Sequence, residues 1–285
     1  MWFTMLLLGL VYGFFVWFLF GVVQDVAFIA VIAIGLVLFQ FFMSDRLVLV
    51  SMRAKIVSRD EAPELHDTIE RLSMAAGIPK PKVAIANLPL PNAFAAGRSQ
   101  KTAVVAVTTG LMELLSEREL EGVLAHEISH IRTRDVVIMT YASFFLVVAS
   151  TLMSLFFWSA LFGGMGRSRG QGGNVLMIAY VVTIVVWFVS QLLVAALSRY
   201  REYSADRGAA LLTRRPADLA SALQRIQAAI TGLPQNDLRR AASLNAFFIM
   251  PAVGGGFARL FATHPPMHHR VERLREMERG VMMLG

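Results

Sequence analysis

Residues His126-Glu127-Ile128-Ser129-His130 form an H-E-x-x-H motif in a segment that the sequence predicts to be helical. Residues four apart lie on the same face of a helix, so the imidazoles of His126 and His130 can bind one metal ion. Glu127 then lies beside that ion, where its carboxylate can accept a proton from water and pass it to a leaving amine. The motif is therefore typical of a zinc peptidase.

The residues around the motif support the helix. Ser116-Glu117-Arg118-Glu119 has the form of a capping box, which marks the start of a helix. An apolar stripe at helical spacing follows, made of Leu120, Val123, Leu124 and Ile128. This context disfavours the alternative of a surface helix that carries two incidental histidines.

Composition indicates a membrane protein. Of the 285 residues 56% are hydrophobic and the mean hydropathy is +0.57, which is too apolar for an ordinary soluble domain. The chain has no cysteine, so a zinc site must use His, Asp, Glu and water. The net charge is +7, but many arginines flank apolar stretches and no nucleic-acid-binding motif is present. We therefore expect a lipid bilayer as a partner and no nucleic acid.

Four uncharged stretches approach or exceed the length that crosses a bilayer, at residues 1–20, 26–43, 136–162 and 175–198. The alternative for the first is a cleavable signal peptide, but it lacks a basic start and a small-residue cleavage site. A glycine-rich loop at 163–174 joins the last two stretches. We predict a transmembrane helical hairpin at 1–43 and a second at 136–198. The catalytic domain is then split between residues 44–135, which include the H-E-x-x-H helix, and residues 199–285.

The basic residues predict the orientation. One side of the membrane receives Arg46, Arg53, Lys55, Arg59, Arg132, Arg134, Arg199, Arg201 and Arg207, and the other only Arg167 and Arg169. The richer side should be cytoplasmic, and the H-E-x-x-H helix lies on it.

The split catalytic domain mixes helices and strands. We predict helices at 61–76 and 216–231, strands at 82–86 and 103–108, and a last basic helix with a stripe of Val271, Leu274 and Met277. Residues 88–97 can run extended between the two strands. Zinc peptidases commonly hold a peptide as an added strand, so Asn92, Ala93, Phe94 and Ala95 are either a substrate-binding strand or a plain connection.

A third metal ligand is expected where the chain returns from the fourth stretch. Catalytic zinc usually has three protein ligands and a water, and Glu202 and Asp206 share a helical face at this point. Glu202 is the candidate ligand, and Asp206 can accept a hydrogen bond from the far nitrogen of a ligating histidine. The alternative is that both acids belong to a solvated helix face.

His264 lies in Thr263-His264-Pro265-Pro266, where Pro265 restricts it to an extended conformation. Three roles are open for it. It can donate a hydrogen bond to the oxyanion, occupy the open zinc position as a latch, or simply order its loop. His268 and His269, at the start of the last helix, are expected to face solvent.

Taken in order along nearly the whole chain, these parts resemble the HtpX family of membrane-embedded zinc endopeptidases, relatives of the CAAX prenyl proteases. The resemblance rests on two N-terminal spans, Pro91-Asn92-Ala93-Phe94-Ala95, the H-E-x-x-H motif, two more spans, Arg201 to Asp206, and Thr263-His264-Pro265-Pro266. It implies a gluzincin-type catalytic domain that faces the bacterial cytoplasm, with His126, His130 and Glu202 as zinc ligands and Glu127 as the base. It also implies the cleavage of misfolded or damaged membrane proteins, in quality control and the stress response.

We therefore predict a mainly α, integral-membrane protein of the bacterial inner membrane. It has four transmembrane helices, a gluzincin-like α+β catalytic domain and one zinc ion per chain. The alternative is a non-enzymatic membrane chaperone or scaffold with a structural zinc site, which usually needs a fourth protein ligand. A transporter or channel is disfavoured because the four stretches lack the ionisable residues that such pathways use.

Cysteine labelling tests the orientation, since the natural chain has no cysteine. In intact cells, Ser116→Cys should be protected from a membrane-impermeant thiol reagent and should react after permeabilisation. Ser168→Cys, in the glycine-rich loop, should react from outside. Labelling of position 116 in intact cells would reverse the predicted topology.

Overall fold

The computed structural model describes residues 2–22, 31, 35, 38, 42, 49–135, 137–139, 142, 146, 149–154, 171–232 and 265–282. The chain divides into two compact units. The first contains Met1–Phe42 and Ile138–Leu197, and the second contains Met43–Val137 and Ser198–Gly285.

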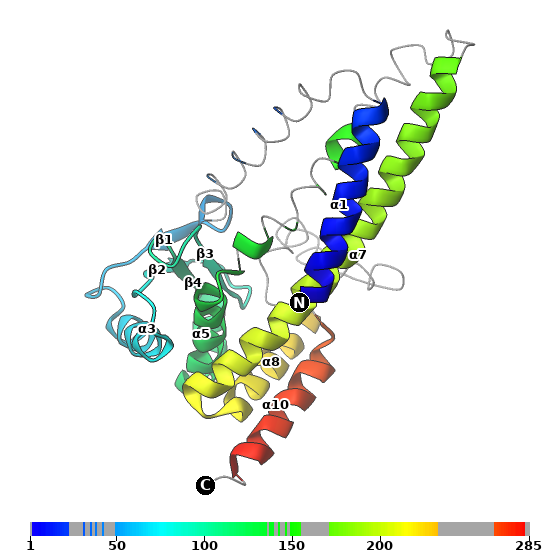
Figure 1. Cartoon of the computed structure of the whole chain (residues 1–285). Helices are drawn as coiled ribbons and strands as arrows, with labels where there is room; N and C mark the ends of the chain where they lie inside the picture. The colour runs from blue at the N-terminus through cyan, green and yellow to red at the C-terminus, as the bar shows by residue number, and fades with distance from the viewer. Residues whose placement is uncertain are drawn as a thin grey trace. The chain divides into compact units, whose positions relative to one another are not determined.

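The first unit is helical. It contains α1 (Trp2–Val22) and most of α7 (Gln171–Thr213), which are both visible in Figure 1. Among the described residues, one helix, Met177–Thr213, is long and apolar enough to cross a bilayer. The Tyr12 hydroxyl donates to the Ala142 carbonyl at 2.6 Å, so this buried polar group is satisfied within the unit. The predicted spans 26–43 and 136–162 lie largely outside the described residues.

The predicted loop at 163–174 is wrong at its end, because residues 171–174 already belong to α7. Each glycine costs a helix about 1 kcal/mol relative to alanine, and the long uninterrupted helix that follows offsets this cost. At its other end α7 continues past Ser198 to Thr213. Glu202 and Asp206 therefore lie on the same helix as the predicted fourth span.

The second unit contains a four-stranded sheet made of β1 (Ala54–Ile56), β2 (Lys82–Ala86), β3 (Ala93–Ala96) and β4 (Val104–Thr108). The strand order is β1-β2-β4-β3, with β2 and β4 parallel and both edge strands antiparallel to their neighbours. All of β4 is buried because both of its faces are covered. Val105 and Val107 join the main core, while Val104 and Ala106 pack on the opposite face.

Three helices contact the strands of the sheet: α3 (Pro63–Ala76), α4 (Thr109–Leu114) and α5 (Glu117–Arg132). Two more, α8 (Pro216–Thr231) and α10 (Met267–Met282), pack against this helical layer and against each other. α5 contacts β3 and α3, and α8 packs against both α5 and α10 (Figure 1). The carboxylate of Glu119 on α5 accepts hydrogen bonds from Ser221 at 2.6 Å and Arg225 at 2.7 Å on α8, which fastens the two helices together.

The local signals in the sequence explain where the helices begin. The predicted capping box of α5 is confirmed, since Ser116 and Glu119 each accept a hydrogen bond from the other's backbone. α3 has Pro63 in its first turn and ends at Gly77, whose φ of 68° is the left-handed conformation that glycine adopts at low cost. The predicted strand β2 and helix α8 have the expected bounds.

α5 and α7 approach very closely at Gly208. A Cβ at Gly208 would lie 2.4 Å from Oγ and 2.8 Å from Cβ of Ser129. Both distances are shorter than non-bonded atoms tolerate, so only a glycine at this position allows the present spacing of the two helices.

We predict that Gly208→Ala destabilises the protein by about 1–3 kcal/mol, the usual cost of overpacking. Adding Ser129→Gly removes both colliding atoms and should recover most of the loss, less roughly 0.5 kcal/mol for glycine within a helix. Gly280→Ala is the matched control, because no atom lies within 4 Å of its Cβ position. Thermal unfolding of the four proteins measures this, and an unchanged melting temperature for Gly208→Ala would contradict the close approach.

Candidate metal centre

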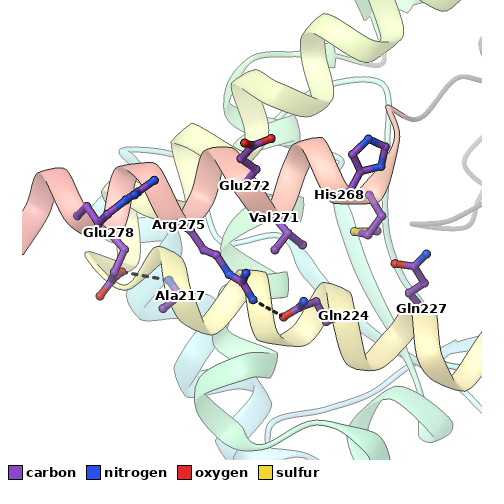
Figure 2. A pocket seen from close by; sticks show the side chains of 10 residues that line it. Ala217, Gln224, Gln227, His268, Val271, Glu272, Arg275 and Glu278 are labelled. Atoms are coloured by element: carbon purple, nitrogen blue, oxygen red, sulfur yellow. Dashed lines mark hydrogen bonds between the residues drawn. The ribbon is translucent and has the colours of Figure 1, made fainter.

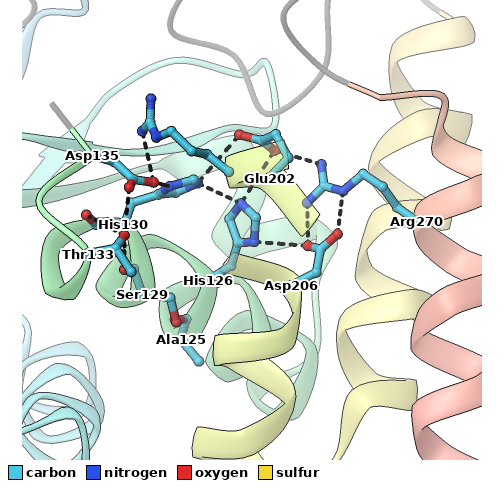
Figure 3. A network of polar contacts seen from close by, with 10 residues as sticks. Ala125, His126, Ser129, His130, Thr133, Asp135, Glu202, Asp206 and Arg270 are labelled. Atoms are coloured by element: carbon cyan, nitrogen blue, oxygen red, sulfur yellow. Dashed lines mark hydrogen bonds and ion pairs between the residues drawn. The ribbon is translucent and has the colours of Figure 1, made fainter. Parts of the chain in front are cut away.

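The two histidines of the H-E-x-x-H motif lie on one face of α5, one helical turn apart (Figure 3). The capping box fixes the start of this helix and the buried Val123, Leu124 and Ile128 hold its apolar side in the core. These contacts fix the rotation of α5 about its axis, and with it the direction in which the two histidines point. The Nε2 atoms of His126 and His130 are 3.1 Å apart, and the two rings meet edge to face with centroids 4.7 Å apart.

Glu202 of α7 completes a set of three ligand atoms. Its Oε1 is 3.4 Å from Nε2 of His130 and its Oε2 is 3.6 Å from Nε2 of His126. The three ligand atoms all lie within 4.8 Å of one another. The sequence-predicted ligands are therefore brought together, although 72 residues of sequence separate His130 from Glu202.

This donor set fits zinc. Bonds of about 2.0–2.1 Å in a tetrahedral site place neighbouring ligand atoms about 3.3 Å apart, close to the separations of these three side chains. Imidazole and carboxylate are both ligands that zinc accepts, and His126 and Glu202 are 3% and 7% exposed. The residues present can therefore hold a zinc ion without moving far.

A carboxylate and an arginine support His126. Asp206 Oδ1 is 3.0 Å from His126 Nδ1, the nitrogen that faces away from the other ligands. Arg270 of α10 donates to both oxygens of Asp206, at 2.8 and 2.6 Å, and its Nη1 is 3.2 Å from Glu202 Oε2 (Figure 3). Arg270 is fully buried. Arg270 therefore links Glu202, the candidate third ligand, to Asp206, the carboxylate that contacts His126.

A second carboxylate and arginine support His130. Asp135 Oδ2 is 2.5 Å from His130 Nδ1 and 2.8 Å from Nη2 of Arg201. The Thr133 hydroxyl donates to the other oxygen of Asp135 at 2.7 Å. Burial alone would raise the pKa of Asp135, but the hydrogen bonds from His130 and Arg201 lower it to about 2. Asp135 is therefore an anion that accepts from His130, which leaves Nε2 of His130 free for a metal.

Glu127 lies between the two histidines and is only 5% exposed. Burial raises the pKa of its carboxyl above the ordinary value, against the opposing effect of His126 and His130. The backbone N–H of Ala95 in β3 donates a hydrogen bond to this carboxylate. The candidate base is thus positioned both by its helix and by an edge of the sheet.

Sequence reasoning missed Asp135, Arg201 and Arg270. Asp135 follows the second histidine by five residues, but its partner Arg201 is distant in sequence. Arg270 directly precedes the apolar stripe of a basic helix, where an arginine ordinarily faces solvent. The predicted residue His264 lies outside the described residues, and His268 and His269 are exposed as expected.

The fold and this site define a zinc metallopeptidase, and comparisons with known proteins agree. The sequence profile of peptidase family M48 matches residues 59–278, so the chain belongs to this family. It is 50% identical over 281 residues to a protease HtpX homolog of Moorella thermoacetica, covering 98% of this chain and 93% of that protein. It is 45% identical over 273 residues to protease HtpX homolog 1 of Streptomyces coelicolor, covering 95% and 89%.

The fold is also similar to a solved structure. The crystal structure of S. mikatae Ste24p matches with a TM-score of 0.60 at 18% sequence identity. The match covers 93% of this chain and 62% of that protein, so this chain spans less than two thirds of its length. This likeness, at low identity, supports the fold. The chain is accordingly an HtpX-type membrane metalloprotease that binds zinc.

Removing the third ligand should remove the metal. Glu202→Ala is expected to lower the zinc content of the purified protein well below one ion per chain, because only two imidazoles remain. Elemental analysis after dialysis against a weak chelator measures this. Unchanged stoichiometry and affinity would rule out Glu202 as a ligand.

A milder effect is expected for Asp206→Asn, which should weaken zinc binding by about 10–100-fold. The amide is preferable to alanine as a test, because alanine would leave the buried Arg270 without its main partner. Asp67→Asn is the control, since Asp67 pairs with Arg59 on the exposed surface. A loss as complete as that of Glu202→Ala would place Asp206 on the metal itself.

Proposed function

We propose that this chain hydrolyses peptide bonds of membrane proteins that are misfolded or damaged, with Glu127 as general base and then general acid. The observation that carries the proposal is the meeting of three ligand atoms from α5 and α7 beside a buried carboxylate. The family supplies the reaction class, and the choice of substrate rests on the apolar character of the chain and on its likeness to HtpX homologs.

The chemistry divides between the metal and the carboxylate. Zinc, when bound, polarises the scissile carbonyl and makes water a stronger acid. Glu127 accepts the proton of the attacking water and later gives it to the leaving amine nitrogen, so its carboxylate is regenerated. A raised pKa suits this role, because the group must hold the proton between the two steps.

The position of β3 at the edge of the sheet supports the proposal of a substrate strand at Asn92, Ala93, Phe94 and Ala95. Within the described part of the chain no strand pairs with the outer edge of β3. The N–H of Ala95 points to Glu127 and not to β4. Ala93 has the same orientation, since the backbone of a strand repeats every two residues. An extended peptide bonded to this edge would therefore run directly past the candidate base.

The backbone of Asn92 fixes the start of this strand. Its N–H donates to the Thr108 hydroxyl at 2.8 Å, and its carbonyl accepts from the Thr108 backbone N–H at 2.9 Å. Phe94 packs with Met52 on the far face of the sheet. The small side chains of Ala93 and Ala95 lie on the other face of β3, where they pack in the main core.

The alternative of a non-enzymatic scaffold with a structural zinc fits less well. Structural zinc is usually closed by four protein ligands, and among the described residues three converge at this point. A structural site also has no need for a buried glutamate, Glu127, that lies beside the ligands without being one of them. We further propose that the catalytic unit faces the cytoplasm of a bacterium, on the arginine distribution described above.

Glu127→Gln tests the peptidase mechanism. The amide cannot accept a proton, so cleavage of a model membrane substrate by the detergent-solubilised protein should fall by at least about 100-fold. Zinc content should stay near that of the wild type, because Glu127 is not a proposed ligand. Chelator-treated wild type is the second control. Normal turnover by Glu127→Gln would refute the assignment.

A further inference from the structure

Asp135 and Arg201 occupy special places in the sequence as well as in the site. Asp135 directly precedes the apolar stretch 136–162, and Arg201 follows the apolar stretch 175–198 by three residues. The two residues are therefore the points at which the chain leaves the catalytic unit and returns to it. Their side chains meet at 2.8 Å.

This ion pair is buried. The side chains of Asp135 and Arg201 are 4% and 12% exposed, so water screens the interaction poorly. The surface pair of Arg59 and Asp67 has side chains 58% and 59% exposed, and pairs of that kind contribute little. A buried carboxylate that lost its arginine would be strongly destabilised. The ion pair therefore holds together the two chain positions that flank residues 136–198.

The same carboxylate holds a metal ligand. Asp135 Oδ2 is shared between Nδ1 of His130, at 2.5 Å, and Arg201. Thr133 fixes the other oxygen, so the carboxylate has little freedom to rotate. Arg201 is also the residue before Glu202, so the return of the chain and the third ligand are set together. Opening of the pair would release the orientation of His130 and the position of Glu202 at once.

We propose that Asp135 and Arg201 form a clamp that couples zinc binding to the pairing of the two chain positions that flank residues 136–198. In this arrangement both are positioning residues that act through His130 and Glu202. The proposal rests on the zinc site proposed above. By thermodynamic linkage, a clamp that strengthens zinc binding is itself strengthened by zinc to the same extent.

The test is a double-mutant cycle on the full-length protein in detergent, with Zn²⁺ affinity measured by chelator competition. Asp135→Asn should weaken zinc binding about 10–100-fold, as expected for a partner of a ligating histidine. Arg201→Gln should weaken it by about 3–10-fold. The zinc affinity of the double variant should equal that of Asp135→Asn to within about 2-fold. Arg201 acts on the site through Asp135, so its loss should have little further effect once Asp135 is changed. Full additivity of the two losses would overturn the clamp.

A spectroscopic readout separates positioning from general stability. The visible spectrum of the Co²⁺-substituted protein reports the ligand geometry, and it should change in Asp135→Asn. Arg225→Gln is a control for general stability, since it breaks an ion pair with the buried Glu119 at 2.7 Å, although Arg225 itself is 47% exposed, and it lies away from the ligands. The control should lower the melting temperature and leave the spectrum and the affinity unchanged. The proposal would also be overturned if Asp135→Asn and Arg201→Gln lowered the melting temperature equally and left the zinc affinity unchanged.

Hydrogen exchange tests the reciprocal effect. Added Zn²⁺ should slow amide exchange at residues 133–139 and 199–203 in the wild type, and should slow it much less in Asp135→Asn. If zinc slowed amide exchange equally in both proteins, the proposed coupling would be refuted. The wild type separates this result from the function itself. A wild type that binds no zinc refutes the proposed function, whereas a wild type that binds zinc as tightly as the variants refutes the clamp alone.

Discussion

The interaction on which the rest depends is the burial of four carboxylates around one point, those of Glu127, Asp135, Glu202 and Asp206. Carboxylates in a poorly solvated site repel one another and cannot all stay ionised without compensation. Arg201 and Arg270 are placed against three of them. Two arginines leave an excess of two negative charges, which a dication with neutral histidines would balance.

This requirement explains why the site draws on so many parts of the chain. α5 supplies the two imidazoles and the candidate base, α7 supplies Glu202 and Asp206, and α10 supplies Arg270. The imidazoles, both acids and Arg270 are visible in Figure 3. No one helix has room for these groups on a single face. The close contact of Gly208 with Ser129 then brings α5 and α7 near enough for the carboxylate of one to reach the imidazoles of the other.

The features that were predicted from the sequence are those that depend on a local pattern of residues. The capping box, the spacing of His126 and His130, and the bounds of β2 and α8 follow from residues near one another in the chain. Glu202 and Asp206 were predictable because the chain must return to the metal after two apolar stretches. The ligand and catalytic roles themselves remain proposals.

Features that depend on distant pairings were not predictable. Arg270 looks like any arginine of a basic helix until Asp206, 64 residues earlier, is seen beside it. Asp135 likewise could not be recognised as part of the site before its ion pair with Arg201 was seen. β1 has only three residues and was missed because such a short strand has no clear alternation. The length of α7 beyond Ser198 was not predicted, because charge marks where a span stops, whereas a helix continues through charged residues.

The groove between α8 and α10 shows how these helices pack beyond the site (Figure 2). Arg275 donates to Gln224 at 3.3 Å, and the Ala217 N–H at the start of α8 donates to Glu278 at 3.1 Å. Val271 and Leu274 are buried on the same helix. Polar contacts at the rim and apolar contacts beneath it thus hold α10 where Arg270 reaches Asp206.

The place of Arg270 in the chain has a consequence for biosynthesis. A ribosome delivers α5 first, then Glu202 and Asp206 on α7, and α10 only after a further stretch of more than 60 residues. Until α10 docks, the carboxylates of Glu202 and Asp206 lack the cation that neutralises them. The growing chain therefore contains the two histidines and Glu127 early, but the arginine that neutralises the neighbouring carboxylates is added late.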